Sequence, residues 1–393
     1  MLEQYRYTPL PWETKPETIR LIKLLPGFSR DQITCTIKQV SLQDRPEYEA
    51  LSYCWGKADD VQESIIIKDH HGADFSLPVR TNLFAALQQL RDMEEPKYVW
   101  ADAICINQSD LDERRRQVLL MCQIYNGAQE TQIWLGKRDA NTYKAFSLMY
   151  KLASAHQIQT EKKDTRFYYQ LGVKGQKEYG LPDMFDSSFK AFSEFLEREW
   201  FTRVWIIQEV AVSKVVNIWC GISSISWKSF IAAIAYATII NIPGISWSNT
   251  TNCQRIVQLE AARRSVSKEH KQSLLSLLIL YRNFNATDMK DKIYSLLGIS
   301  HEVGPDAIQI DSDYTIDDTE VYKRFTVSIL EQRRSLDILS VPRVSKASRV
   351  GELPSWVGDW SVSDFCMTFR FMLDSEQYFL DFEATPSSLA FSP

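Results

Sequence analysis

The chain has 393 residues, of which 45% are hydrophobic and 24% charged, and a formal net charge of −5. This balance is typical of a globular protein with a sizeable core, in one large domain or two ordinary ones. Basic residues gather only in short runs such as Arg114–Arg116, whereas a nucleic-acid binder usually carries a basic excess or a basic stripe. We therefore expect no nucleic-acid partner.

The first half of the chain is rich in strand patterns. Alternating apolar residues on both sides of Pro26-Gly27 predict a β-hairpin over residues 17–40. Further strands are predicted at 48–55, 64–68, 74–79, 98–106, 131–135 and 215–220. Helical spacing predicts one helix over Thr81–Met93 and another from a capping box at Ser109–Asp112 to Asn126-Gly127. Strands that alternate with helices in this way predict a parallel α/β sheet flanked by helices.

The second half is mainly helical in pattern. Helices are predicted at 189–199, 227–241, 253–268, 271–284 and 317–333. Residues 156–183 are polar and predict an insertion, while 203–212 fit a strand and a helix equally well. The 13-residue apolar run Phe230–Ile242 is shorter than the roughly 20 residues of a membrane span, so we expect a buried helix there. The predicted parts are thus a β extension (1–45), an α/β domain (46–221) and a mainly helical region (222–393).

Several familiar chemical sites are missing from the sequence. It contains no GxxxxGK[ST] phosphate loop and no GxGxxG, HExxH or GxSxG motif, and its five histidines are scattered. The seven cysteines form no CxxC pair, and the N-terminal residues show no apolar core of a signal peptide. We therefore expect a cytoplasmic protein with reduced thiols, without a bound metal or cofactor.

Polar residues within apolar runs are the remaining candidates for a site. Asp102 interrupts the run 99–106, and a buried carboxylate is costly unless it is paired or hydrogen-bonded. It therefore belongs either to a site at the end of a parallel strand or to a structural pair or cap. Asn107 and Gln108 follow it and either orient a ligand or shape the turn. Glu113 and Gln117 share one face of the next helix, as part of a site or as a solvated helix start.

A second group of candidates lies at two other strand or helix ends. Ser52 and Tyr53 precede Trp55 and Gly56 at a strand end, where glycine lets a backbone approach a ligand closely. Glu209 is an acid within the apolar run after Trp205, and is either catalytic or a structural partner of Arg203. The tryptophans of this chain are more typical of a core than of a cofactor stack.

These residues carry a family resemblance. The chain resembles the heterokaryon incompatibility (HET) domain family through six segments spread between residues 48 and 361, so that the resemblance extends over most of the chain. The segments are YEALSYCWG (48–56), WADAICINQSDLDERRRQVLLMCQIYNGA (100–128), IWLG (133–136), RVWIIQEVA (203–211), DKIYSLLGI (291–299) and LPSWVGDWS (353–361). The resemblance implies a role in fungal nonself recognition, in which activation of the domain triggers growth arrest or cell death.

HET domains also resemble TIR domains distantly, which implies a TIR-like sheet. In TIR domains that cleave NAD, the acid lies in a Trp-Cys-x-x-Glu segment. Trp205-Ile-Ile-Gln-Glu209 is similar, although Ile206 stands at the cysteine position. The resemblance thus implies Glu209 as a catalytic acid and NAD as a substrate, with the other candidates binding or supporting.

The sequence leaves three functions open. Cleavage of the nicotinamide–ribose bond passes through an oxocarbenium-like state that one carboxylate can stabilise, without a metal or histidine. A non-enzymatic signalling module would act by self-association through the HET core, with an unknown nonself partner. A stand-alone biosynthetic enzyme would have reused the fold, because fold alone does not fix function.

Overall fold

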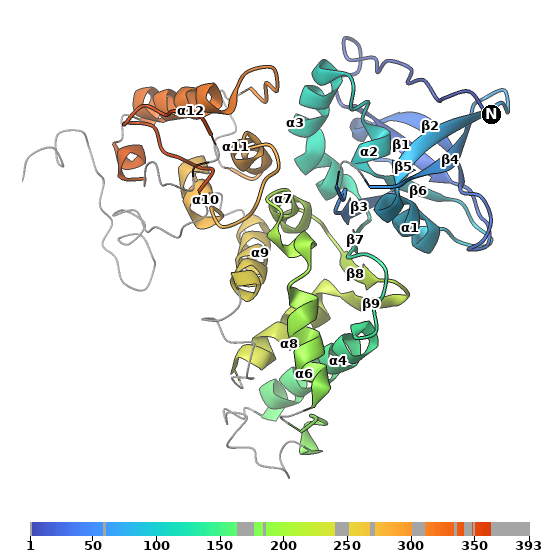
Figure 1. Cartoon of the computed structure of the whole chain (residues 1–393), viewed down its shortest axis with the longest axis vertical. Coiled ribbons are helices and arrows are strands. Elements are labelled where there is room, and N and C mark those ends of the chain that lie inside the picture. Colours follow the sequence, from blue (N-terminus) through green and yellow to red (C-terminus); the bar gives the residue numbers. More distant parts are fainter. Residues whose placement is uncertain are drawn as a thin grey trace, which may run out of the picture. The chain divides into compact units, whose positions relative to one another are not determined.

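The computed structural model describes residues 2–57, 60–162, 177–183, 186–239, 251–267, 272–300, 311–333, 336–341, 348 and 350–362. The chain divides into two compact units (Figure 1). The first unit contains Met1–Arg114, Gln123–Phe201 and Val212–Glu260, and the second contains Arg115–Cys122, Thr202–Ala211 and Ala261–Pro393.

A nine-stranded sheet forms the core of the first unit, in the order β5-β4-β2-β1-β6-β3-β7-β8-β9. The strands are β1 (Thr18–Leu24), β2 (Thr34–Ser41), β3 (Glu49–Tyr53), β4 (Gln62–Lys68), β5 (Asp74–Arg80), β6 (Lys97–Trp100), β7 (Glu130–Trp134), β8 (Val216–Cys220) and β9 (Ser223–Ser226). Its centre is parallel, because β3 pairs in parallel with β6 and β7, and β7 with β8. The predicted α/β class and the antiparallel β1–β2 hairpin are confirmed, and the hairpin continues the same sheet.

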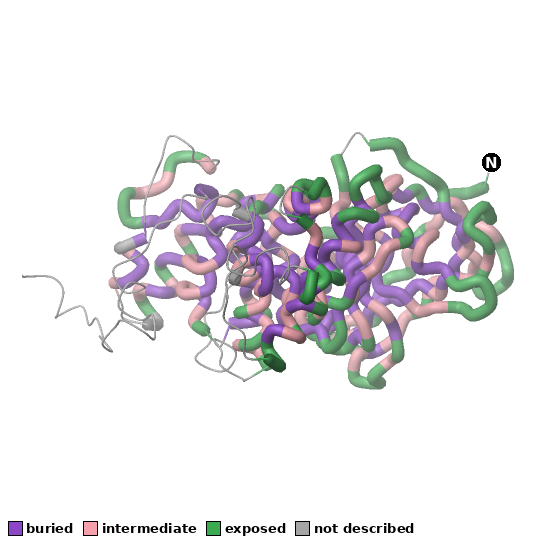
Figure 2. The backbone as a smooth tube through the Cα atoms, turned by 90° about the horizontal axis from the view of Figure 1, so that it is seen from below, coloured by how far each residue is buried: buried purple, intermediate pink, exposed green. Residues whose placement is uncertain are grey.

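Helices of the first unit pack against this sheet and against one another. They are α1 (Thr81–Leu90), α2 (Asp102–Cys105), the two ends of α3 (Leu111–Gly127), α4 (Thr142–Lys162), α6 (Ser187–Leu196), α8 (Trp227–Ile239) and the start of α9 (Thr251–Ser267). The inward residues are apolar: α1 buries Leu83 and Leu87, and α6 buries Phe192 and Phe195. Figure 2 shows that most of the first residues of the chain, next to the N label, are exposed.

The described parts of the second unit are mainly helical, as predicted for the C-terminal region. They include the middle of α3, α7 (Ile206–Ala211), the end of α9, α10 (Leu274–Leu280), α11 (Asp291–Leu297) and α12 (Asp318–Arg333). Arg282 and Lys292 are buried here, and both are bound to backbone carbonyl oxygens. Among the described residues of both units, no helix is long and apolar enough to cross a membrane.

Three local predictions were wrong in part. The run 98–106 is not one strand, because β6 ends at Trp100 and α2 begins at Asp102. A short buried helix and a buried strand have the same apolar composition, so periodicity does not separate them. Residues 156–162 continue α4, while 163–176 lie outside the described residues. The cap of α3 is Asp110, whose side chain accepts the Glu113 N–H, one residue later than predicted.

The segment 203–212, whose sequence fits a strand and a helix equally well, contains a helix. Residues 206–211 form α7, and all six are buried. The residues before it are tied to the turn after α10, because the Val204 N–H donates to the Asn285 carbonyl (2.8 Å). This backbone pairing lies within the second unit and is invisible to local periodicity.

Candidate functional site

The carboxyl ends of the four central strands meet at one edge of the sheet, because those strands are parallel. Trp55 follows β3, and Asp102 follows the neighbouring strand β6. The Trp55 indole Nε1 donates a hydrogen bond to Asp102 Oδ2 (2.8 Å), and both side chains are half-buried. Asp102 Oδ1 also accepts the Ala103 N–H (2.8 Å). The structure thus brings two predicted site residues together.

Two residues that the sequence analysis did not single out complete this cluster. Arg80 Nη1 donates to the carbonyl oxygens of Trp55 (3.3 Å) and Gly56 (2.9 Å). Its guanidinium carbon lies 5.8 Å from the centre of the Trp55 ring, within cation–π distance. Asn82 Nδ2 donates to the Cys54 carbonyl (2.7 Å). We call Trp55, Gly56, Arg80, Asn82 and Asp102 the sheet-edge cluster.

Asn82 joins two strand ends. Its amide nitrogen binds the end of β3, and its Oδ1 accepts a hydrogen bond from Trp134 Nε1 (2.9 Å) at the end of β7. From β3 the chain turns toward the β6 side of the sheet, and from β7 toward the β8 side. In open α/β sheets, ligands bind outside the carboxyl ends of strands where such connections diverge. The only sequence signal for Arg80 and Asn82 was their place between a strand and a helix.

The loop after Asp102 is fixed by a buried ion pair. Glu113 is 3% exposed and Arg20 is 1% exposed. The Arg20 guanidinium contacts both Glu113 oxygens (2.5 and 2.9 Å), and Glu113 Oε1 also accepts the Asn107 N–H (2.6 Å). Gln108 Nε2 donates to the Asp102 carbonyl (3.0 Å). Glu113 and Gln108 therefore hold the backbone on both sides of the α2 turn.

The other candidates of the first unit have local or internal contacts. The Asn107 side chain accepts a hydrogen bond from the Ser109 hydroxyl (2.7 Å), which shapes the turn before α3. Ser52 is buried and accepts a hydrogen bond from Trp200 Nε1 (2.8 Å). Tyr53 is 3% exposed. Ser52 and Tyr53 therefore support the sheet edge from within the core, and Asn107 shapes the loop beside it.

Three candidates lie in the second unit. Gln117, on the middle of α3, is fully buried, and Glu209, on α7, is 3% exposed. Trp205 is half-buried one helical turn before Glu209, whose N–H donates to the Trp205 carbonyl (3.3 Å). Burial of a carboxylate costs free energy unless a partner compensates its charge. Functional acids and structural acids are both found buried in this way, so burial does not separate the two roles. A common cleft for Asp102, Glu113 and Glu209 stays a prediction, because Glu209 belongs to a different unit.

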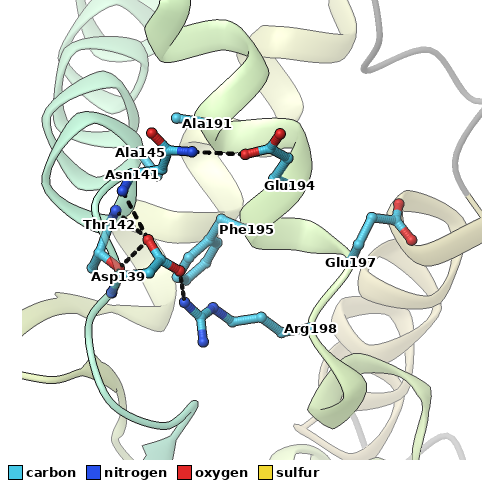
Figure 3. Close-up of a pocket in the computed structure, with 9 residues that line it drawn as sticks. All are labelled: Asp139, Asn141, Thr142, Ala145, Ala191, Glu194, Phe195, Glu197 and Arg198. Atoms are coloured by element: carbon cyan, nitrogen blue, oxygen red, sulfur yellow. Dashed lines mark hydrogen bonds and ion pairs between the residues drawn. The ribbon is translucent and has the colours of Figure 1, made fainter.

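A cavity of about 280 Å³ lies between the start of α4 and the end of α6 (Figure 3). Asp139 receives hydrogen bonds from Thr142 and the first N–H groups of α4, and pairs with Arg198 (2.6 Å). Glu194 accepts from Asn141 (2.9 Å), and Glu197 accepts from Asn252 (3.2 Å). The carboxylates of this cavity thus already have protein partners, which accounts for them as helix caps and packing contacts.

Among the residues that the structure describes, no group of three or more His, Cys, Asp and Glu side chains is arranged to hold a metal ion. Two cysteines near the sheet are deeply buried. Burial raises the pKa of Cys105 to about 12 and that of Cys35 to about 12. A thiol with such a pKa stays protonated at neutral pH and is a poor nucleophile. The chemistry of the described side chains is therefore that of carboxylates, amides, arginines and indoles.

Comparison with known proteins identifies the class of this fold. The sequence profile of the family described as heterokaryon incompatibility protein (HET) matches residues 48–209. That range contains every candidate residue from Ser52 to Glu209, and also Arg80 and Asn82. Residues 48–209 of this chain therefore belong to the heterokaryon incompatibility domain family, which confirms the resemblance seen in the sequence.

One curated relative matches over most of the chain. "Heterokaryon incompatibility protein 6, OR allele" of Neurospora crassa is 26% identical over 87% of this chain. The chain spans 58% of the length of that relative. No solved structure matches the chain.

Proposed function

We propose that this protein acts in fungal heterokaryon incompatibility, as an effector whose activation stops growth or kills the cell. The support is the family match over residues 48–209 together with the relative named for incompatibility. The matched range includes the sheet-edge cluster and the α7 acid, so the residues with chemical capacity fall inside the family's domain. The relative is longer than this chain, and its activity is carried over here only as part of the proposal.

We further propose that the effector step is cleavage of NAD, with Glu209 as the acid. The support is a carboxylate 3% exposed on α7, one turn after Trp205. In this reaction the bond between nicotinamide and ribose C1′ breaks, and nicotinamide leaves with the bonding pair. A water oxygen bonds to C1′ and releases a proton. A carboxylate in a water-poor site stabilises the positive charge that develops on the ribose in the transition state.

The test is expression in a fungal host that lacks the gene, with growth and total cellular NAD measured together. We expect the wild-type chain to arrest growth and deplete NAD, and Glu209→Gln to do neither. Glu331→Gln is the matched control, because Glu331 is an exposed glutamate on α12 of the same unit. Immunoblots must show equal amounts of the three proteins.

Other outcomes favour the alternative functions. If Glu209→Gln arrests growth as strongly as wild type while NAD stays constant, the NAD proposal is refuted and self-association through the HET core is favoured. If expression of the wild-type chain is harmless and NAD is unchanged, the effector proposal fails and a biosynthetic role for the domain is favoured.

A further inference from the structure

Arg80 makes no ion pair among the residues that the structure describes. It is half-buried and lies beside the carboxyl end of β3, where it binds the backbone of Trp55 and Gly56. Its only described hydrogen bonds run from Nη1 to two carbonyl oxygens, which are neutral groups. Nε and Nη2 keep their N–H groups for another acceptor, because a guanidinium carries five donors in a fixed fork.

The guanidinium is also held in one place. The carbonyl oxygens of Trp55 and Gly56 fix one side of it, and the Trp55 ring lies 5.8 Å from its centre. The ring is itself fixed by the 2.8 Å hydrogen bond to Asp102. An anion that binds Arg80 therefore does not have to order a free side chain, which would otherwise reduce its affinity.

Nearby carboxylates are occupied elsewhere. Asp102 binds the Trp55 indole and the Ala103 N–H. Asp60 Oδ2 accepts the Lys57 N–H (2.7 Å). The first turn of α1, which follows Arg80 directly, contains no acidic residue. Both aspartates are held by neutral donors, and no described carboxylate forms an ion pair with the Arg80 guanidinium.

The surroundings indicate which anion fits. Gly56 is exposed and has φ +79°, a conformation that L side chains rarely adopt, and Asp60 Oδ2 occupies the place that a Cβ would take there. Trp55 is half-buried and offers part of an indole surface next to the cation. An arginine fork binds phosphate oxygens in pairs, and an indole stacks with an aromatic ring.

We propose that Arg80 binds the phosphate of a nucleoside phosphate whose base packs near Trp55. The site lies where the chain connections of β3 and β7 diverge, with Asn82 linking the two strand ends. This assignment rests on the proposed function only for the expectation that a nucleotide is present. Its test measures binding and needs no turnover.

The experiment titrates the purified full chain with three probes, by calorimetry and by tryptophan fluorescence. ADP carries both charge and base, adenosine carries only the base, and inorganic pyrophosphate carries only the charge. We expect ADP to bind at least about tenfold more tightly than adenosine, since a charge-assisted hydrogen bond contributes at least about that factor. We expect ADP also to bind more tightly than pyrophosphate.

Variants separate the two contributions. Arg80→Gln should weaken ADP about tenfold or more and leave adenosine unchanged, while Arg80→Lys should recover part of the loss by restoring the charge. Trp55→Leu should weaken ADP and adenosine alike. Arg6→Gln is the control, because Arg6 is an 86% exposed arginine whose described ion pair is with Glu3 in the same unit. Circular dichroism and thermal unfolding check that each variant is folded.

Two results would overturn the assignment: no binding of ADP to the wild-type chain, or equal ADP affinity in wild type and a folded Arg80→Gln. Equal affinity for pyrophosphate and ADP would overturn the role given to Trp55. Failure here is distinguishable from failure of the proposed function. If NAD levels stay constant in cells but ADP binding depends on Arg80, the cleavage proposal fails and the nucleotide site stands.

Discussion

Replacing Glu113 with alanine should be among the most damaging single changes in the first unit. Glu113 and Arg20 are 3% and 1% exposed, and two short contacts join them. Arg20 would keep its hydrogen bonds to the carbonyls of Cys105 and Thr8, but its charge would stay buried without a counter-charge. The Asn107 N–H would also lose its acceptor.

The magnitude follows from this burial. Removing one member of a buried, hydrogen-bonded ion pair costs about 3–5 kcal/mol in free energy of unfolding. The control is Glu320→Ala, which removes an i,i+4 pair with Arg324 whose side chains are 39% and 58% exposed. Such an exposed pair contributes only about 0.3–0.5 kcal/mol. The double variant Arg20→Met/Glu113→Leu should recover most of the loss, because it leaves no buried charge.

Equilibrium urea unfolding, followed by far-UV circular dichroism and tryptophan fluorescence, measures these differences. The loop that carries Asp102 should also loosen in Glu113→Ala, which hydrogen exchange of residues 104–108 would detect. The reasoning is refuted if Glu113→Ala loses no more stability than Glu320→Ala, or if the double variant is less stable than Glu113→Ala alone.

Three further predictions concern a carboxylate, a thiol and a glycine. Burial alone would raise the pKa of Asp139, but hydrogen bonds from Thr142 and the start of α4 hold the pKa below its ordinary value. The stabilisation is therefore present at neutral pH and lost as the pH falls through the lowered pKa. The unfolding temperatures of wild type and Asp139→Asn should converge on acidification, and a constant gap would contradict this. Iodoacetamide at pH 8 should label half-exposed Cys122 well before Cys105, whose pKa is raised to about 12 by burial. Mass spectrometry of the labelled peptides measures this order, and labelling of Cys105 before Cys122 would contradict the prediction. Gly298→Ala should cost about 1–3 kcal/mol, because the added Cβ would lie 2.5 Å from Cys122 Cβ; Gly351→Ala, where the nearest atom is 3.4 Å away, is the control for urea unfolding.

Much of the fold was predictable because its signals are local. The apolar spacing and stop signal of α3 predicted its end at Gly127, and strand patterns predicted most of the parallel strands. The prediction of one strand over residues 98–106 was wrong, and the reason is local as well. Its apolar residues are buried both in a strand and in the short helix that starts at Asp102, so the pattern is the same for both.

The candidate site was predictable only in part. Trp55 stands out at an apparent strand end and Asp102 as a carboxylate within an apolar run, and the parallel pairing of β3 and β6 brings them together. Arg80 lies 25 residues from the Trp55 carbonyl that it binds, and its place between a strand and a helix is too common a signal to single it out. Its position depends on where β5 ends relative to β3, which is set by strand pairing.

The sequence by itself determined the family, the α/β class and the acids within apolar runs, because each is written in residues that are close together in the chain. Only the tertiary structure decided the strand order, the partners of Asp102 and Glu113, and the place of Arg80. Arg20 and Glu113 are 93 residues apart and meet because β1 lies beside β6 in the sheet. Such pairings depend on packing between many residues that are far apart in the chain. Periodicity reports only on residues that are close together in the chain, so it does not predict these pairings.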